Sequence, residues 1–389
     1  MNTLITRMQA VQSPIIPVVG ELISQNPGTI SLGQGVVYYA PPPETFDRVP
    51  QFLANPDNHK YKAVEGIPPL LETLKIKLKT DNNIEINDDN CLLITAGGNM
   101  AFLNAILAIT SPGDEIILPT PYYFNHEMAI AISSCQPVLV PTDANYQLNI
   151  EALRAAITDK TRAIVTVSPN NPTGVVYPQE ALLEVNQLCR EKRIYHISDE
   201  AYEYFTYNGV KHISPGSFAD SSEHTISLFS LSKAYGFASW RIGYMIIPQH
   251  LRVSVMKIQD TNLICPPVIC QYAALGALQV GKNYCLQHIK NIESVRKLVL
   301  RSLDKIADIC TVPQAEGAFY FLLKVQTDMS AMTLVERLIT EDKIAVIPGT
   351  TFGMEKGCYL RVAYGALQKE TVSEGMGRLV KGLQRILKN

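Results

Sequence analysis

The sequence has no excess of basic charge and no uninterrupted apolar run long enough to cross a membrane. Its 389 residues carry 34 Lys and Arg against 36 Asp and Glu, a formal net charge of -2. Without a net positive field, nothing attracts nucleic acid or an anionic membrane. The longest apolar stretches, 101–118 and 128–140, are interrupted by residues such as Asn104 and Pro112, whereas a membrane-spanning helix needs about 20 mostly apolar residues. We therefore expect neither nucleic acid nor a membrane as a partner.

The cysteines and the N-terminal residues show no pattern of export or of metal binding. None of the eight cysteines forms a Cys-x-x-Cys pair, so we expect neither a disulfide framework nor a metal site. Residues 1–9 lack the apolar core and the small-residue cleavage site of a secretory signal. Cysteines without such spacings in a long chain are typically buried and reduced. The sequence therefore predicts a cytoplasmic protein.

The sequence does contain a repeated alternation of short apolar runs and helix-like stretches, in a chain of globular composition with 47% hydrophobic residues. The runs predict strands over residues 91–95, 115–118, 137–140, 163–167, 194–198 and 225–230. Helical periodicity lies between them, over residues 100–108, 122–133, 150–157 and 178–192. This alternation is typical of βα units, which form a mainly parallel sheet with helices on both faces. We expect an α/β fold whose large domain has three layers, α/β/α.

The C-terminal part of the chain predicts a second, smaller α+β domain. A long helical pattern over 267–309 precedes strands at 318–324, 344–347 and 359–362, a helix at 331–341 and a terminal helix. Residues 30–33 have a strand-like pattern and are expected to join this domain. The predicted division is an N-terminal arm with the first part of the small domain over 1–44, a large domain over 45–280 and the rest of the small domain over 281–389.

The segment 230–243 has the most specific chemical pattern. A strand delivers Ser230, Ser232 and Lys233 to its carboxyl edge, where open α/β sheets bind ligands, and Arg241 follows. A lysine between hydroxyls and an arginine suits an imine to an aldehyde whose phosphate is held nearby. The plainer alternative is a solvated lysine in a polar turn, with Arg241 paired to a surface acid.

Three further strand ends carry polar or glycine-rich turns. Asp199 and Tyr202 could hold a pyridinium nitrogen and the oxygen beside it, or could simply cap a helix. Asn171 lies in a Pro-Asn-Asn-Pro-Thr-Gly turn and is a candidate hydrogen-bond donor, although such a turn needs no functional explanation. The turn Thr95-Ala-Gly-Gly98 opens a helix whose free amides could bind an anion.

Taken in order, these motifs and Tyr359-Leu-Arg361-Val-Ala resemble the class I/II aminotransferases, the fold-type-I pyridoxal-phosphate enzymes. The resemblance implies pyridoxal 5′-phosphate as cofactor, with Lys233, Asp199 and Tyr202 as catalytic residues. Lys233 corresponds to the lysine that carries the cofactor, and Asp199 to the acid beside the pyridine nitrogen. It also implies cis peptides at Asn171-Pro172 and Thr120-Pro121. The cofactor-binding set that it implies is Tyr61, Gly98, Asn99, Met100, Tyr123, Asn171, Asp199, Tyr202, Ser230, Ser232, Lys233 and Arg241.

The resemblance further implies how the substrates bind and how the chain assembles. Arg361 corresponds to the arginine that binds the substrate α-carboxylate, and Gly35, Asn171 and Tyr38 are expected to contact the substrate as well. Tyr61 corresponds to a tyrosine that reaches the phosphate of the neighbouring subunit. The expected partners are therefore an amino acid, a 2-oxo acid and a second copy of the chain in a homodimer with shared active sites.

The chain departs from the family pattern where substrate specificity is decided. Val36-Val-Tyr-Tyr39 replaces the usual run after the glycine, and residues 261–271 contain no Arg or Lys to pair with a distal carboxylate. We therefore expect an enzyme that moves the amino group of aromatic or apolar L-amino acids by a ping-pong route. Its sequence motifs are most similar to those of plant-type aromatic and methionine aminotransferases. The alternatives are an aspartate-type aminotransferase and a carbon–sulfur lyase on the same scaffold. A transcription regulator that reuses the scaffold would need a basic DNA-binding segment, which we do not find before residue 30.

Overall fold

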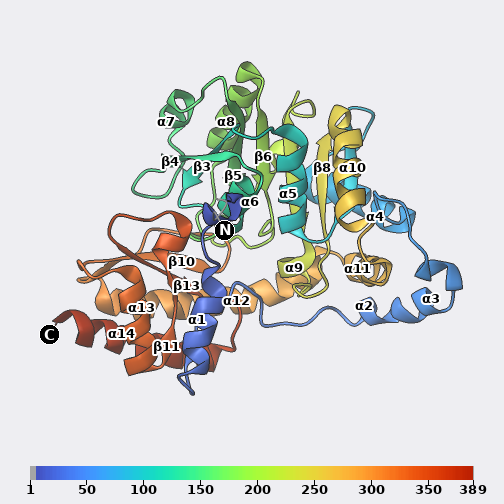
Figure 1. The fold of residues 1–389 in the computed structure, drawn as a ribbon. Coiled ribbons are helices and arrows are strands. Elements are labelled where there is room, and N and C mark those ends of the chain that lie inside the picture. The colour runs from blue at the N-terminus through green and yellow to red at the C-terminus, as the bar shows by residue number, and fades with distance from the viewer. Residues whose placement is uncertain (1–5, 389) are drawn as a thin grey trace, which may run out of the picture.

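The computed structural model describes residues 6–388, and its larger sheet has seven strands in the order β2-β8-β7-β6-β5-β3-β4 (Figure 1). These strands are β2 (Asn90–Thr95), β3 (Glu115–Thr120), β4 (Gln136–Pro141), β5 (Thr161–Val167), β6 (Tyr195–Asp199), β7 (Thr225–Ser230) and β8 (Gly243–Pro248). All neighbours are parallel except β8, which runs antiparallel to both β2 and β7. The sheet is therefore mainly parallel, as predicted, but β8 was not predicted.

Helices cover both faces of this sheet because successive side chains of a strand point to opposite faces. Ile116 and Leu118 pack in one apolar cluster with Phe102 and Ile130, while Ile117 packs in another with Val185. The predicted three-layer arrangement is confirmed. The helices of this part of the chain are α2 (Glu44–Asp47), α3 (Val49–Leu53), α4 (Pro68–Asn82), α5 (Gly98–Ile109), α6 (Phe124–Ile132), α7 (Ile150–Ala155), α8 (Gln179–Lys192), α9 (Leu231–Ala234), α10 (Arg252–Leu263) and α11 (Val268–Val280).

The second, smaller domain contains two short sheets flanked by long helices. Its strands are β1 (Ile30–Ser31), β9 (Cys310–Thr311), β10 (Tyr320–Val325), β11 (Ile344–Ala345), β12 (Ile347–Pro348) and β13 (Cys358–Ala363). Its helices are α1 (Ile15–Ser24), α12 (Lys282–Leu303), α13 (Ala331–Asp342) and α14 (Lys369–Lys388). Strand β1 pairs in parallel with β11, so the N-terminal segment does join this domain. The single strand predicted over 344–347 is two strands, which belong to two different sheets.

Figure 1 shows how the N-terminal arm and α12 connect the two domains. Near the start of the described chain, Arg7 Nη1 donates to Ile132 O beside α6, and Gln12 Nε2 donates to Glu127 of the same helix. Helix α1 then packs on α13 of the small domain. This path brings residues 33–40 across the carboxyl edge of the large sheet, where the candidate site lies.

Three X-Pro peptide bonds are cis: Thr120-Pro121, Asn171-Pro172 and Ser168-Pro169. The first two confirm the prediction and the third was not predicted. Within residues 6–388, no single helix is long and apolar enough to cross a membrane, although the bent pair Gln249–Leu263 and Val268–Val280 passes a test of length and composition. The same part of the chain holds no group of three His, Cys, Asp or Glu placed to bind a metal ion.

Candidate active site

A cavity of about 340 Å³ lies where the carboxyl ends of β5, β6 and β7 face the small domain. Val167, Asp199 and Ser230, the last residues of these three strands, line it. Ligands of open α/β sheets bind at this edge because the strands deliver side chains there and the following turns leave space. The cavity is lined by Ile16, Gln34, Gly35, Val36, Gly98, Asn99, Tyr123, Phe124, Val167, Asn171, Asp199, Ala201, Tyr202, Ser230, Ser232, Lys233, Arg241, Tyr320 and Arg361.

Lys233 lies in the short helix α9 directly after β7. The Ser230 side chain caps this helix by accepting a hydrogen bond from the backbone N–H of Ser232 at 3.2 Å. From the opposite side, the Tyr39 hydroxyl donates to the carbonyl oxygen of Lys233 at 2.8 Å. The backbone of Lys233 is therefore held by hydrogen bonds from two separate segments of the chain, one that contains Ser230 and one that contains Tyr39. Its Nζ reaches into the cavity and donates to the carbonyl oxygen of Gly35.

The environment of Lys233 favours a neutral amine. Burial, followed by the positive charges of Arg361 and Arg241, lowers the pKa of Lys233 to about 8, while the Asp199 carboxylate acts in the opposite sense. An ordinary lysine has a pKa of roughly 10.4. A primary amine that loses its proton near neutral pH can attack a carbonyl and can also accept a proton from carbon.

An anion cradle lies next to this amine. The first amides of α5, which begins at Gly98, have no partner within the helix and are free to bind an anion. Arg241 Nη1 lies 3.5 Å from Ser232 Oγ, which brings a guanidinium and a hydroxyl to the same place. Gly97 has a φ of +83°, and a Cβ added there would collide with the Arg241 guanidinium. The glycine therefore permits the close approach that this donor set needs, and the set fits a phosphate.

Asp199 faces the other end of the cavity and is held by a histidine. His126 Nε2 lies 3.0 Å from Asp199 Oδ2, and the backbone N–H of Ala201 donates to Oδ1 at 3.1 Å. The imidazole stacks on Phe102 with a centroid separation of 4.0 Å. His126 was not predicted, although it lies one turn after Tyr123 in the first part of α6, a spacing that could have indicated it.

Arg361 is buried and joins the small domain to the turn after β5. Its Nη1 donates to Asn171 Oδ1 at 2.9 Å and its Nη2 donates to Gly33 O at 2.7 Å. Because Oδ1 of Asn171 is occupied, Nδ2 faces the Tyr202 hydroxyl at 3.3 Å. The Tyr202 hydroxyl also lies 2.8 Å from that of Tyr320. A guanidinium, an amide and two phenols thus form one chain along the cavity wall.

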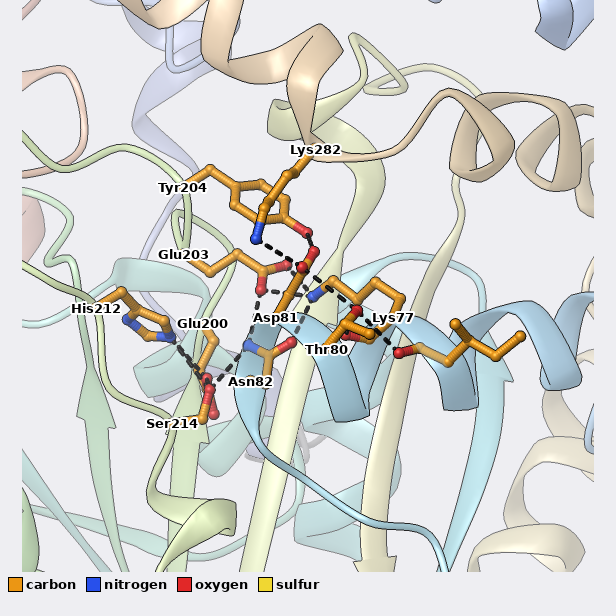
Figure 2. A network of polar contacts seen from close by, with 11 residues as sticks. Lys77, Thr80, Asp81, Asn82, Glu200, Glu203, Tyr204, His212, Ser214 and Lys282 are labelled. Carbon is orange, nitrogen blue, oxygen red and sulfur yellow. Dashed lines mark hydrogen bonds and ion pairs between the residues drawn. The ribbon is translucent and has the colours of Figure 1, made fainter.

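A buried polar network anchors the segment that carries Asp199 and Tyr202 (Figure 2). Glu203 accepts hydrogen bonds from Lys77 Nζ and from Asn82 Nδ2 of α4, and the side chains of the Lys77–Glu203 pair are only 9% and 8% exposed. Next to Asp199, Glu200 accepts from Ser214 Oγ and lies 2.8 Å from His212 Nε2. Charged and polar side chains that do not line the cavity therefore fix the position of residues 199–205.

Most of the predicted site residues meet in this cavity, and three do not line it. Met100 can contribute only its backbone amide at the start of α5, and Tyr61 is 77% exposed on the surface of the single chain. Tyr38, expected to contact the substrate, instead faces α12. Its hydroxyl lies 3.1 Å from His288 Nδ1 and accepts from Asn291 Nδ2, and its ring packs edge-on against His288.

Sequence reasoning missed several residues that line the cavity, because they come from segments with no chemical motif. Ile16 and Gln34 belong to the N-terminal arm, and Tyr320 is the first residue of β10, a strand that also contains Phe321, Leu322 and Leu323. Phe124 follows Tyr123 at the start of α6. Only the aromatic run at 122–124 gave any signal for these residues.

Fold and site together indicate an α/β enzyme whose cavity, with a buried lysine beside an anion cradle, fits a phosphorylated aldehyde cofactor. Comparison with protein families agrees: the chain belongs to the class I and II aminotransferases, whose family model matches residues 27–379. The protein is therefore a pyridoxal-phosphate-dependent aminotransferase, and the resemblance seen in the sequence is confirmed at the level of family, fold and cofactor.

The relatives of the chain differ in the substrates their names give. It is 34% identical over 324 residues to an aspartate aminotransferase of Pyrococcus abyssi, with 82% of each chain covered. It is 29% identical over 390 residues to aromatic aminotransferase ISS1 of Arabidopsis thaliana, with 98% of this chain and 96% of the relative covered. Among solved structures, a double mutant of the Thermus thermophilus aspartate aminotransferase superposes with a TM-score of 0.89 at 29% identity, covering 98% of this chain and all of that one.

Proposed function

We propose that this aminotransferase takes the amino group from aromatic or other apolar L-amino acids and passes it to a 2-oxo acid by a ping-pong route. The observation that carries the proposal is the charge inventory of the cavity. Among residues 6–388, the only cationic side chains that line it are Lys233, Arg241 and Arg361. We assign each of them a role other than binding a distal carboxylate. The other lining residues include the neutral Gln34, Val36 and Asn99.

The lining residues match the cofactor group by group. When bound, pyridoxal phosphate supplies the aldehyde that captures the amine and the ring that withdraws electrons from the substrate. Lys233 would carry the aldehyde, the Asp199 carboxylate would pair with the protonated ring nitrogen, and Tyr123 would lie on the ring face. Asn171 and Tyr202 would donate hydrogen bonds to the ring oxygen. The phosphate would be held by Ser230, Ser232, Arg241 and the amides of Gly98, Asn99 and Met100.

The chemistry of the chain then follows from two residues. Arg361 presents two N–H groups that can bind the α-carboxylate of the donor side by side, which fixes the Cα–H bond relative to the ring. With the cofactor bound, Lys233 Nζ would accept the proton from Cα of the donor. A pKa of about 8 leaves a useful fraction of this amine neutral at pH 7.

The side-chain end of the cavity supports an apolar donor. The residues that line the cavity include the apolar side chains of Ile16, Val36 and Phe124 and the ring of Tyr320. An aromatic side chain that enters buries roughly 150–250 Å². A distal carboxylate would lose its hydration without gaining a cation, which is costly. Gln34 and Asn99 are lining amides that could bind such a carboxylate, and for that reason the aspartate-type alternative is tested directly.

A homodimer in a reducing, cytoplasmic compartment completes the proposal. Tyr61 is too exposed to serve its own cavity, so a role at a phosphate would be played in a second subunit. The exposed apolar side chains Phe46, Leu53 and Ile76 lie in the same N-terminal part of the large domain and support an interface there. All eight cysteines are free, as is usual for proteins kept reduced.

The test is a comparison of kcat/KM for phenylalanine, tyrosine, methionine, alanine and aspartate, with the spectrum of the bound cofactor followed through each half-reaction. We expect the three large apolar donors to exceed aspartate. A higher kcat/KM for aspartate would overturn the substrate assignment in favour of the aspartate type. Release of pyruvate and ammonia without an oxo-acid requirement would instead indicate the lyase alternative.

A further inference from the structure

Tyr320 has a polar atom inside the active site that the proposed transamination does not use. Its side chain is fully buried and lies in strand β10 of the small domain. Within residues 6–388, the only hydrogen-bond partner of its hydroxyl is Tyr202, at 2.8 Å. A buried hydroxyl in a ligand cavity that contacts one catalytic phenol calls for a functional explanation, because a phenylalanine would fill the same space.

Three contacts fix the position of this hydroxyl. The Arg361 guanidinium lies over the ring of Tyr320, 4.7 Å from its centroid. The ring of Tyr202 packs edge-on against it at 5.5 Å. A Cβ added to Gly35 would lie 2.6 Å from the Tyr320 hydroxyl oxygen, so the N-terminal segment closes over it and only a glycine fits. The hydroxyl therefore has little freedom to turn away from Tyr202.

Hydrogen-bond accounting sets the direction of the contact between the two phenols. Each phenol has one proton to donate and can accept two hydrogen bonds. If Tyr202 gives its proton to the ring oxygen of the cofactor, it has none left for Tyr320. The hydrogen bond at 2.8 Å then requires Tyr320 to donate and Tyr202 to accept.

We propose that Tyr320 is a positioning residue that strengthens the hydrogen bond from Tyr202 to the cofactor ring oxygen. The inference rests on the proposed function, since it takes Tyr202 as the partner of that oxygen. A phenol that accepts a hydrogen bond becomes a better donor, because the two bonds polarise each other.

The consequence is a shift in the titration of the bound cofactor. Donation to the ring oxygen stabilises its negative charge, which makes the neighbouring lysine-linked nitrogen easier to deprotonate. Weakening the donor should therefore raise the pH at which the loaded enzyme changes colour. Loss of one hydrogen bond to a charged oxygen in Tyr202→Phe should raise this midpoint by about one to two pH units. Loss of the supporting bond in Tyr320→Phe should raise it by roughly 0.3 to 1 unit.

The experiment is a spectrophotometric pH titration of the loaded enzyme and of three variants: Tyr202→Phe, Tyr320→Phe and the double variant. We expect both single variants to raise the midpoint, and the double variant to match Tyr202→Phe because Tyr320 acts through Tyr202. Tyr364→Phe is the matched control, since it removes another buried hydroxyl whose residue does not line the cavity. Its midpoint should equal that of the unmodified enzyme.

The outcomes separate the inference from the proposed function. A shift in Tyr202→Phe with none in Tyr320→Phe overturns the inference and leaves the assignment of Tyr202 intact. No shift in either variant removes Tyr202 from the ring oxygen and the inference with it. Additive shifts in the double variant would show that Tyr320 acts independently, which also overturns it. If Tyr320→Phe does not fold, 3-fluorotyrosine at position 320 replaces it: a more acidic phenol should lower the midpoint, and an unchanged midpoint contradicts the inference.

Discussion

Arg361 Nη1 donates to Asn171 Oδ1 at 2.9 Å, so an arginine of the small domain sets the orientation of an amide of the large domain. The guanidinium is buried, and its Nη2 is held by Gly33 O at 2.7 Å. One residue therefore prepares both the proposed carboxylate site and the amide that would face the cofactor ring. The first prediction concerns this arginine.

Arg361→Ala should lower kcat/KM by about 10²–10⁴-fold, the loss expected from two charge-assisted hydrogen bonds to the α-carboxylate. Arg361→Lys keeps the charge but loses the planar fork, so it should still cost about tenfold or more. The spectrum of the lysine-bound cofactor should stay intact in both variants. Steady-state kinetics with the donor and the oxo acid provide the measurement. Loss of cofactor with an unchanged KM would show that Arg361 serves the cofactor instead.

The lowered pKa of Lys233 predicts the pH dependence of cofactor loading. Only the neutral amine attacks an aldehyde, and Lys233 is protonated below its pKa of about 8. The rate at which the cofactor-free enzyme takes up pyridoxal phosphate should therefore rise through pH 8 and level off above it. Removing the like charge in Arg361→Ala should move the midpoint upward, and Arg361→Lys should leave it near 8. A midpoint near 10 in the unmodified enzyme would contradict the environment described for this amine.

Gly97→Ala should weaken cofactor binding, because the new Cβ would collide with the Arg241 guanidinium that completes the anion cradle. Gly113 is the matched control: its φ of +89° is similar to the +83° of Gly97, but a Cβ there meets nothing within 4 Å. Both alanine variants should lose about 1 kcal/mol of stability from the left-handed backbone. Only Gly97→Ala should raise the Kd for pyridoxal phosphate. Equal Kd values for the two variants would remove Gly97 from the cradle.

Lys77→Met should destabilise the fold by about 3–5 kcal/mol, because it leaves the Glu203 carboxylate buried without its cation. Replacing both partners, as Lys77→Met with Glu203→Gln, should recover part of this loss. Lys79→Met on the same helix breaks the exposed Lys79–Glu85 pair and should leave stability unchanged. Chemical denaturation of the cofactor-free enzyme measures the free energy of unfolding. Equal losses in the free energy of unfolding for the two lysine variants would show that the buried pair stabilises the fold no more than the exposed pair does.

Mixing two inactive chains tests the proposed dimer. In a mixed dimer of Lys233→Ala and Tyr61→Ala chains, one of the two sites combines an intact Lys233 with an intact Tyr61 from the other subunit. Activity should therefore return on mixing, whereas the activity of each variant alone should stay low when the cofactor concentration is limiting. Sedimentation provides the control for assembly. A fully active monomer would rule out the shared site.

Local sequence patterns were sufficient for the strands and turns that carry the chemistry. Asp199 ends a predicted strand, and Lys233 and Asn171 follow soon after two others, so parallel strands bring all three to one edge of the sheet. The positions of these residues were therefore predictable from the sequence, and the resemblance of the ordered motifs to a known family gave the family and the cofactor. Strand β8 was not, because its antiparallel direction is set by its neighbours β2 and β7.

Tertiary structure alone decided the contacts between segments that are far apart in the chain. Tyr320 lies 118 positions from Tyr202, and no periodicity indicates that β10 would place its hydroxyl there. Tyr38 was assigned to the substrate by its neighbours in sequence, yet α12 supplies His288 and Asn291 as polar partners for its hydroxyl. Sequence determines which residues each strand end presents, since that depends on local hydrogen bonding and side-chain alternation. Which of them touch depends on how two domains and the N-terminal arm pack, and only the folded chain fixes that packing.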